Sequence, residues 1–134
     1  TDRLDQPNGL AFSPDESVLY VSDTSDVTRE AQGGGPITAF DVVDGRDLAN
    51  PRVFHVVPGG VPDGFRVDVD GNVWTSAHDG IHVVAPDGRR LGRLPLPEAT
   101  ANCVFDGPQG TRLFITATTS LYAIDVGTRG ATGP

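Results

Sequence analysis

Methionine is absent from this 134-residue chain, cysteine occurs once, and no long apolar run is present. Because Cys103 stands alone, no disulfide forms within the chain and no group of thiolates is available to bind zinc. The apolar runs fall short of the roughly 20 residues that a membrane-spanning helix needs, and the N-terminus has no secretory signal pattern. We expect a soluble protein, and the sequence leaves open whether it is cytoplasmic or periplasmic. Since the chain opens on Thr1, we expect it to be processed or a fragment.

Positive charge is also scarce. Lysine and arginine together number 10 against 18 aspartate and glutamate residues, which gives a formal net charge of −8. A surface of this sign repels phosphate backbones and anionic lipid. We therefore expect neither nucleic acid nor a membrane surface as a partner.

Helical periodicity is the third absence. The 17 glycines and 11 prolines interrupt the chain every few residues, and no segment keeps apolar residues at positions i, i+3, i+4 and i+7. What remains is about eleven short runs of valine, isoleucine, leucine and aromatic residues, each bounded by turn residues. The sequence predicts an all-β fold.

Two hairpins define one repeating unit. Residues 65–76 carry the turn Asp70-Gly71-Asn72, and a second hairpin follows around Pro86-Asp87-Gly88. Aspartate, asparagine and glycine are the residues that tight turns favour. Pro95-Leu96-Pro97 ends the unit, because proline removes donors from a β-ladder. Residues 68–72 also match the start of a calcium-binding loop, but the glycine comes too early and the distal glutamate is missing, so we predict a hairpin turn.

Self-comparison shows three copies of this unit, opening at Asn8, Asp63 and Asn102. Their spacing brackets the ~40–50 residue period of four-stranded β-propeller blades. We predict that residues 1–134 form a partial β-propeller with three blades. The blades span about 6–57, about 61–97 and about 100–126, and a flexible tail follows at 127–134. The first copy is lengthened by a loop at 24–36, which we expect to be a mobile excursion.

The third copy lacks a fourth strand, and three blades are too few to close a propeller around a central channel. The first strand of each blade lines that channel, so Asn8, Asp63 and Asn102 are expected to converge on its axis. Oxygen ligands from separate blades can meet there at one hard cation. Pro-Asn-Gly and Pro-Asp-Gly are also favoured turn sequences, so backbone geometry alone is an alternative explanation.

Several phrases resemble the gluconolactonase, regucalcin and luciferin-regenerating-enzyme family, and bacterial gluconolactonases most of all. They are residues 6–15 (QPNGLAFSPD), 19–24 (LYVSDT), 61–68 (VPDGFRVD), 71–77 (GNVWTSA) and 113–117 (LFITA). The resemblance covers nearly the whole chain. It implies a six-bladed propeller of about twice this length, of which this chain looks like the C-terminal half.

The resemblance also implies a site and a reaction. Asn8 and Asp63 match ligands of one divalent cation, most often Ca²⁺, with Zn²⁺, Mg²⁺ or Mn²⁺ as alternatives. Asp63 matches the proposed general base, and the implied reaction is hydrolysis of a sugar lactone to an aldonic acid in carbohydrate metabolism. Asn102 matches a polar channel position and is a candidate substrate contact, although asparagine also serves turns. His78 is a second candidate at the channel mouth, with an ordinary loop position as the alternative.

Two departures limit this picture. The family's remaining ligand is a glutamate in a Glu-Gly-Pro context, which is absent here, and Glu16, Glu30 and Glu98 fall in predicted turns or loops. Asp106 replaces a glycine of the family's Phe-Gly-Gly. The chain is therefore expected to need the missing N-terminal blades, or a second copy of itself, for activity. The alternatives are a non-catalytic propeller fragment that acts as a binding or assembly module, and a hydrolase of organophosphates or other esters.

Overall fold

A computed structural model of the chain describes residues 4–25 and 34–131. The described residues contain eleven β-strands and no helix, so the predicted all-β fold and the number of strands are confirmed. No helix able to cross a membrane occurs in this part of the chain. Most of the mobile loop predicted at 24–36 lies outside the described residues.

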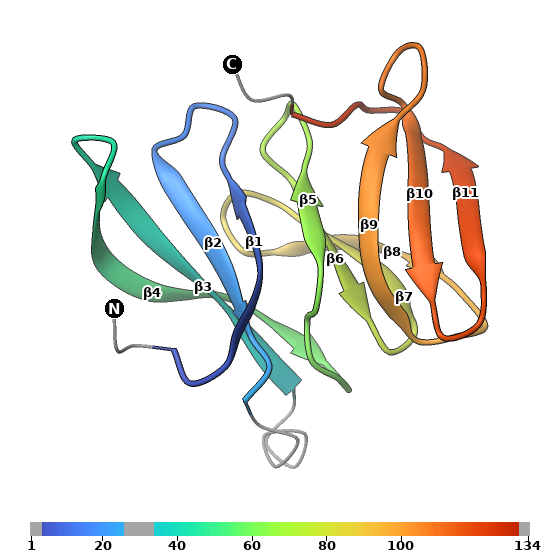
Figure 1. The fold of residues 1–134 in the computed structure, drawn as a ribbon, viewed down its shortest axis with the longest axis horizontal. Coiled ribbons are helices and arrows are strands. Elements are labelled where there is room, and N and C mark those ends of the chain that lie inside the picture. Colours follow the sequence, from blue (N-terminus) through green and yellow to red (C-terminus); the bar gives the residue numbers. More distant parts are fainter. Residues whose placement is uncertain (1–3, 26–33, 132–134) are drawn as a thin grey trace.

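The first sheet joins four antiparallel strands in chain order (Figure 1). They are β1 (Pro7–Phe12), β2 (Val18–Asp23), β3 (Gly34–Val43) and β4 (Asp47–Pro58). Ile37 pairs with His55 and Thr38 with Val53, so Phe54 is an extra residue in β4. Such a β-bulge bends a strand and re-aims its side chains.

The second sheet also has four antiparallel strands in chain order. They are β5 (Phe65–Val67), β6 (Val73–Ala77), β7 (Gly80–Val84) and β8 (Arg90–Pro95). Both predicted hairpins are confirmed, and Gly71 and Gly88 at their turns have φ of 82° and 85°. Glycine adopts this left-handed conformation without the steric cost that other residues incur.

Asp68 holds the first of these turns together. Its Oδ1 accepts hydrogen bonds from the amides of Asp70 and Asn72, and its Oδ2 accepts one from Trp74 Nε1 at 2.9 Å. The side chain is buried, and its oxygens bind the protein's own donors. Residues 68–72 therefore form a hairpin turn, as predicted.

The third sheet has three strands, β9 (Thr100–Asp106), β10 (Arg112–Ala117) and β11 (Leu121–Asp125), in the order β11-β10-β9. As predicted, no fourth strand follows within the described residues. The chain instead returns to the second sheet: Ala131 N donates to Val67 O, and Arg129 O accepts from Val69 N. This first part of the predicted flexible tail is thus hydrogen-bonded to the edge of β5, and its last three residues lie outside the described part.

Two apolar layers join the three sheets, which stand side by side in Figure 1. The layer between the first and second sheets is a cluster of buried side chains that includes Tyr20, Ile37, Val57, Phe65 and Val84. The layer between the second and third sheets is built on Ile81, Cys103, Leu113 and Ile115, with Trp74 packed edge-on against Phe105. Each large apolar side chain buried here contributes about 1.5–3 kcal/mol, so these layers fix the sheets relative to one another.

Candidate functional site

Asn8, Asp63 and Asn102 lie near the beginnings of β1, β5 and β9, which are neighbouring strands at one end of the molecule (Figure 1). The backbones are in close contact there. A Cβ on Gly9 would lie 2.1 Å from the backbone oxygen of Asp63, and one on Gly64 would lie 2.2 Å from Asn102 Cγ. Gly64 N also donates to Ala101 O at 2.7 Å. The starts of the first strands of all three sheets therefore meet, and glycine is what allows them to approach.

The three side chains differ in exposure. Asn8 and Asn102 are exposed, whereas Asp63 is half-buried between them. Asn102 Oδ1 accepts a hydrogen bond from the Cys103 amide at 2.9 Å, which orients the side chain. Within the described residues no three histidine, cysteine, aspartate or glutamate side chains come together as a metal-binding group. A cation at this end would have to draw on asparagine oxygens beside the Asp63 carboxylate.

Two buried serines fix the backbone of Asp63 from either side. Ser76 Oγ accepts a hydrogen bond from Asp63 N at 3.0 Å. Ser22 Oγ lies 2.9 Å from Asp63 O, to which it donates, and it accepts from Gly9 N at 2.8 Å. Both serines are fully buried. The position of Asp63 is thus set by the first and second sheets together.

These serines were not predicted as site residues, although the sequence carries a signal for them. Ser22 and Ser76 occupy the same place in the first and second repeats, and Thr116 occupies it in the third. Thr116 Oγ1 donates to the backbone oxygen of Asn102 at 3.4 Å. Each hydroxyl thus contacts the first strand of its own sheet or, for Ser76, the residue two positions before that strand. A hydroxyl at a repeated apolar-strand position indicates a hydrogen bond that recurs with the repeat.

His78 lies at the same end but apart from the cluster. It follows β6 and is exposed, and a Cβ built on Gly60 would lie 3.2 Å from His78 Cβ. Among the described residues no hydrogen bond links it to Asn8, Asp63 or Asn102. Its role as a substrate contact stays a prediction.

The two glutamates within the described residues, Glu16 and Glu98, lie in turns or loops, as expected. Glu16 is in the β1–β2 turn with φ of 57°. Glu98 binds Ser120 Oγ and the Thr119 amide, and these hydrogen bonds lower its pKa to about 2. Glu30 lies outside the described residues. Asp106 ends β9, the strand that begins beside Asn102, so it lies away from the cluster.

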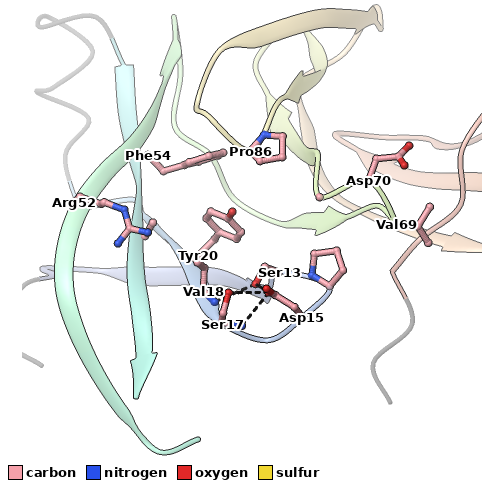
Figure 2. Close-up of a pocket in the computed structure, with 13 residues that line it drawn as sticks. Ser13, Asp15, Ser17, Val18, Tyr20, Arg52, Phe54, Val69, Asp70 and Pro86 are labelled. Carbon is pink, nitrogen blue, oxygen red and sulfur yellow. Dashed lines mark hydrogen bonds between the residues drawn. The ribbon is translucent and has the colours of Figure 1, made fainter. Parts of the chain in front are cut away.

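A hollow of about 430 Å³ lies between the first and second sheets at their other end (Figure 2). Tyr20 and Phe54 form one side, with ring centroids 4.7 Å apart, and Pro86 and Asp70 come from turns of the second sheet. Asp15 is held at its rim by Ser13 and Ser17, whose hydrogen bonds lower its pKa to about 2. The hollow is formed by the turns at the far ends of β1 and β5, so it is separate from the Asp63 cluster.

Comparison with known proteins places the chain in a family. The family model described as SMP-30/gluconolactonase/LRE-like region matches residues 1–119. The chain belongs to this family, and the resemblance seen in the sequence is confirmed.

The chain is 34% identical over 138 aligned residues to the gluconolactonase of Zymomonas mobilis, covering 95% of this chain and 36% of that protein. It is 36% identical over 114 residues to the L-arabinolactonase of Azospirillum brasilense, covering 82% of this chain and 35% of that protein. The solved structure of a gluconolactonase from Xanthomonas campestris is 47% identical with a TM-score of 0.80, covering 91% of this chain and 38% of that one. The chain thus spans little more than a third of the length of these relatives.

Proposed function

We propose that this chain is part of a sugar-lactone hydrolase and that Asn8, Asp63 and Asn102 belong to its active site. The observation that carries the proposal is the meeting of three strand starts around a half-buried carboxylate whose backbone is held by Ser22 and Ser76. The gluconolactonase of Zymomonas mobilis and the L-arabinolactonase of Azospirillum brasilense, both relatives of this chain, support lactones as the substrate class.

The reaction adds water across the ester bond of the lactone ring. The Asp63 carboxylate accepts a proton from the attacking water as the new C–O bond forms at the lactone carbonyl. The ring C–O bond then breaks, the leaving alkoxide takes the proton back from Asp63 to become a hydroxyl, and the new carboxylic acid ionises and releases one proton to water. The Asn102 amide lies on the neighbouring strand, where it can donate to a substrate hydroxyl. His78 lies at the same end of the molecule but outside the cluster, and from there it can contact the sugar.

A divalent cation fits the chemistry of this cluster in part. Asn8 and Asp63 would hold it through oxygen atoms, the ligand type that Ca²⁺ and Mg²⁺ prefer. When bound, such a cation polarises the lactone carbonyl. Calcium takes six to eight oxygens, more than two side chains offer, so further ligands have to come from water or from other blades.

The outer faces of the described sheets support a larger, closed propeller, for which the family resemblance implies six blades. On the first sheet Leu10 and Phe12 are 59% and 44% exposed, and on the third sheet Leu121 is 71% exposed. Apolar side chains on both outer sheets indicate neighbours on both sides. In this proposal the missing blades, or a second copy of the chain, cover these faces and supply the remaining cation ligands.

The test uses the propeller closed by the further blades or by a second copy. It compares hydrolysis of gluconolactone and L-arabinolactone, measured as proton release at constant pH, between the unmodified protein and its Asp63→Asn variant. We expect D63N to lose about 10²–10⁴-fold in kcat, the usual contribution of a general base, and chelation of divalent cations to lower the activity of the unmodified protein. Asp70→Asn is the matched control, because Asp70 is exposed in the β5–β6 turn away from the cluster.

Equal activity of D63N and D70N would refute the role of Asp63. An unmodified protein that hydrolyses neither lactone, yet binds a partner protein, would instead favour the non-catalytic module.

A further inference from the structure

We propose that His55 and His82 form a binding site for a divalent transition-metal ion of the Zn²⁺ type between the first and second sheets, separate from the Asp63 cluster. Nothing in the lactonase proposal uses these two residues. They are contributed by β4 and β7, which belong to different sheets.

Both imidazoles enter the same layer. His55 is two residues before Val57 and His82 is two residues before Val84, and both valines belong to the buried cluster between the first two sheets. Side chains two residues apart on a strand share a face. The bulge at Phe54 adds a residue just before His55, so Phe54 and His55 both turn toward the second sheet. The two rings therefore point into one interface from opposite sides.

One nitrogen of each ring is fixed by an acceptor. His55 Nδ1 lies 2.9 Å from Gly88 O, and because a carbonyl only accepts, Nδ1 carries the hydrogen. His82 Nε2 lies 2.7 Å from Asp79 Oδ1. Asp79 also pairs with Arg93, and although burial opposes it, hydrogen bonds from Arg93 and His82 lower the pKa of this carboxyl. The ionised Asp79 thus accepts from His82 Nε2.

The other nitrogen of each ring has no partner. His55 Nε2 and His82 Nδ1 are both buried without a hydrogen bond, and the His82 side chain is 1% exposed. Burial lowers the pKa of His55 and, together with His82 and Arg90, outweighs the hydrogen bond to Gly88, which raises it. Its Nε2 is therefore a bare lone pair at neutral pH. A buried polar atom without a partner destabilises the folded protein, so two in one layer indicate a missing ligand.

A transition-metal ion suits these nitrogens better than other ligands. Histidines that bind metals usually donate their second ring N–H to a carboxylate or a backbone carbonyl, which sets the tautomer and the ring orientation. Asp79 does this for His82 and Gly88 for His55, so both known kinds of support are present. Imidazole favours zinc, copper and nickel over calcium or magnesium.

The expected site is weaker than a structural zinc site. Four protein ligands are the rule for those sites, and no third histidine, cysteine, aspartate or glutamate joins the pair among the described residues. Water molecules have to complete the coordination. A metal bound there links β4 to the second sheet, so it stabilises the interface that holds the first two sheets together.

Zinc binding to metal-free D63N protein tests the proposal, because this variant removes the carboxylate of the other candidate site. We expect one Zn²⁺ per chain by calorimetry, and a melting temperature raised by about 5 °C or more at a hundredfold excess over Kd. Adding His82→Gln should weaken binding at least tenfold. Adding His78→Gln, the matched loss of an exposed histidine, should leave it unchanged.

Nitrogen NMR of the folded D63N protein provides a readout that needs no second variant. Zn²⁺ should shift His55 Nε2 and His82 Nδ1 and leave the His78 ring unaffected. Absence of zinc binding in D63N, unmoved His55 and His82 resonances, or equal loss of binding in H78Q and H82Q would overturn the proposal.

Discussion

Replacing Ser22 with alanine tests whether the first sheet positions Asp63. The Ser22 hydroxyl accepts from Gly9 N at 2.8 Å and donates to Asp63 O at 2.9 Å, in a fully buried position. Ser22→Ala removes one net hydrogen bond, worth about 1 kcal/mol, and leaves the Gly9 amide without a partner, which costs about 1–3 kcal/mol more. We expect a loss of about 2–4 kcal/mol in the free energy of unfolding.

Urea unfolding measures this loss, and a slope of about 1–3 kcal/mol per molar translates it into a fall of about 1 M or more in the midpoint. Lactone hydrolysis should fall by about tenfold or more at a temperature where S22A is folded, because Asp63 loses one of its two backbone supports. Ser17→Ala is the control: Ser17 is exposed and binds Asp15 on the same sheet. Its loss should stay below about 1 kcal/mol. Equal stabilities of S22A and S17A would refute the reasoning.

Two further predictions concern the same end of the molecule. Gly9→Ala places a Cβ 2.1 Å from the backbone oxygen of Asp63, so the free energy of unfolding measured by denaturant titration should fall by more than about 2 kcal/mol. Gly92→Ala is the control, because a Cβ there has nothing within 4 Å, and it should change the free energy of unfolding by less than about 1 kcal/mol. Similar effects for both alanines would contradict the close approach. Burial raises the pKa of Asp23, but hydrogen bonds from Ser25 and from backbone amides outweigh it and lower the value to about 2. A lowered carboxyl pKa stabilises the fold at pH values above the ordinary pKa of 3.8, and this stabilisation is lost as the pH falls toward 2. The free energy of unfolding should therefore lose about 1 kcal/mol from Asp23 between pH 6 and pH 3. Asp23→Asn should abolish that part of the acid sensitivity, and an unchanged pH dependence would show that Asp23 does not contribute.

Much of the fold follows from local patterns in the sequence. The turn residues around Gly71 and Gly88 predicted the hairpins of the second sheet, and the structure has them at those positions. Turn chemistry acts over a few residues, so it can be read without knowing the tertiary structure. The pairing of residues 129–131 with β5 was not predicted, because an edge strand accepts a partner from any part of the chain that reaches it.

The candidate site, too, could be predicted only in part from the sequence. The repeats at Asn8, Asp63 and Asn102 indicated equivalent places on successive sheets, and the family membership that the sequence phrases suggested is confirmed. The repeats place hydroxyls at Ser22 and Ser76 but do not show which residues they bind, since the hydrogen bond from Ser22 to Asp63 depends on how the first and second sheets pack.

The sequence by itself determined the strands, their turns, the repeat and the family, because each depends on residues close together in the chain or on recurring phrases. Only the tertiary structure decided which side chains meet across the sheets. It placed Gly9 against Asp63 and turned His55 and His82 into one buried layer. Contacts of this kind join residues far apart in the chain, and their geometry is set by a bulge, a glycine or a packed interface rather than by any local pattern.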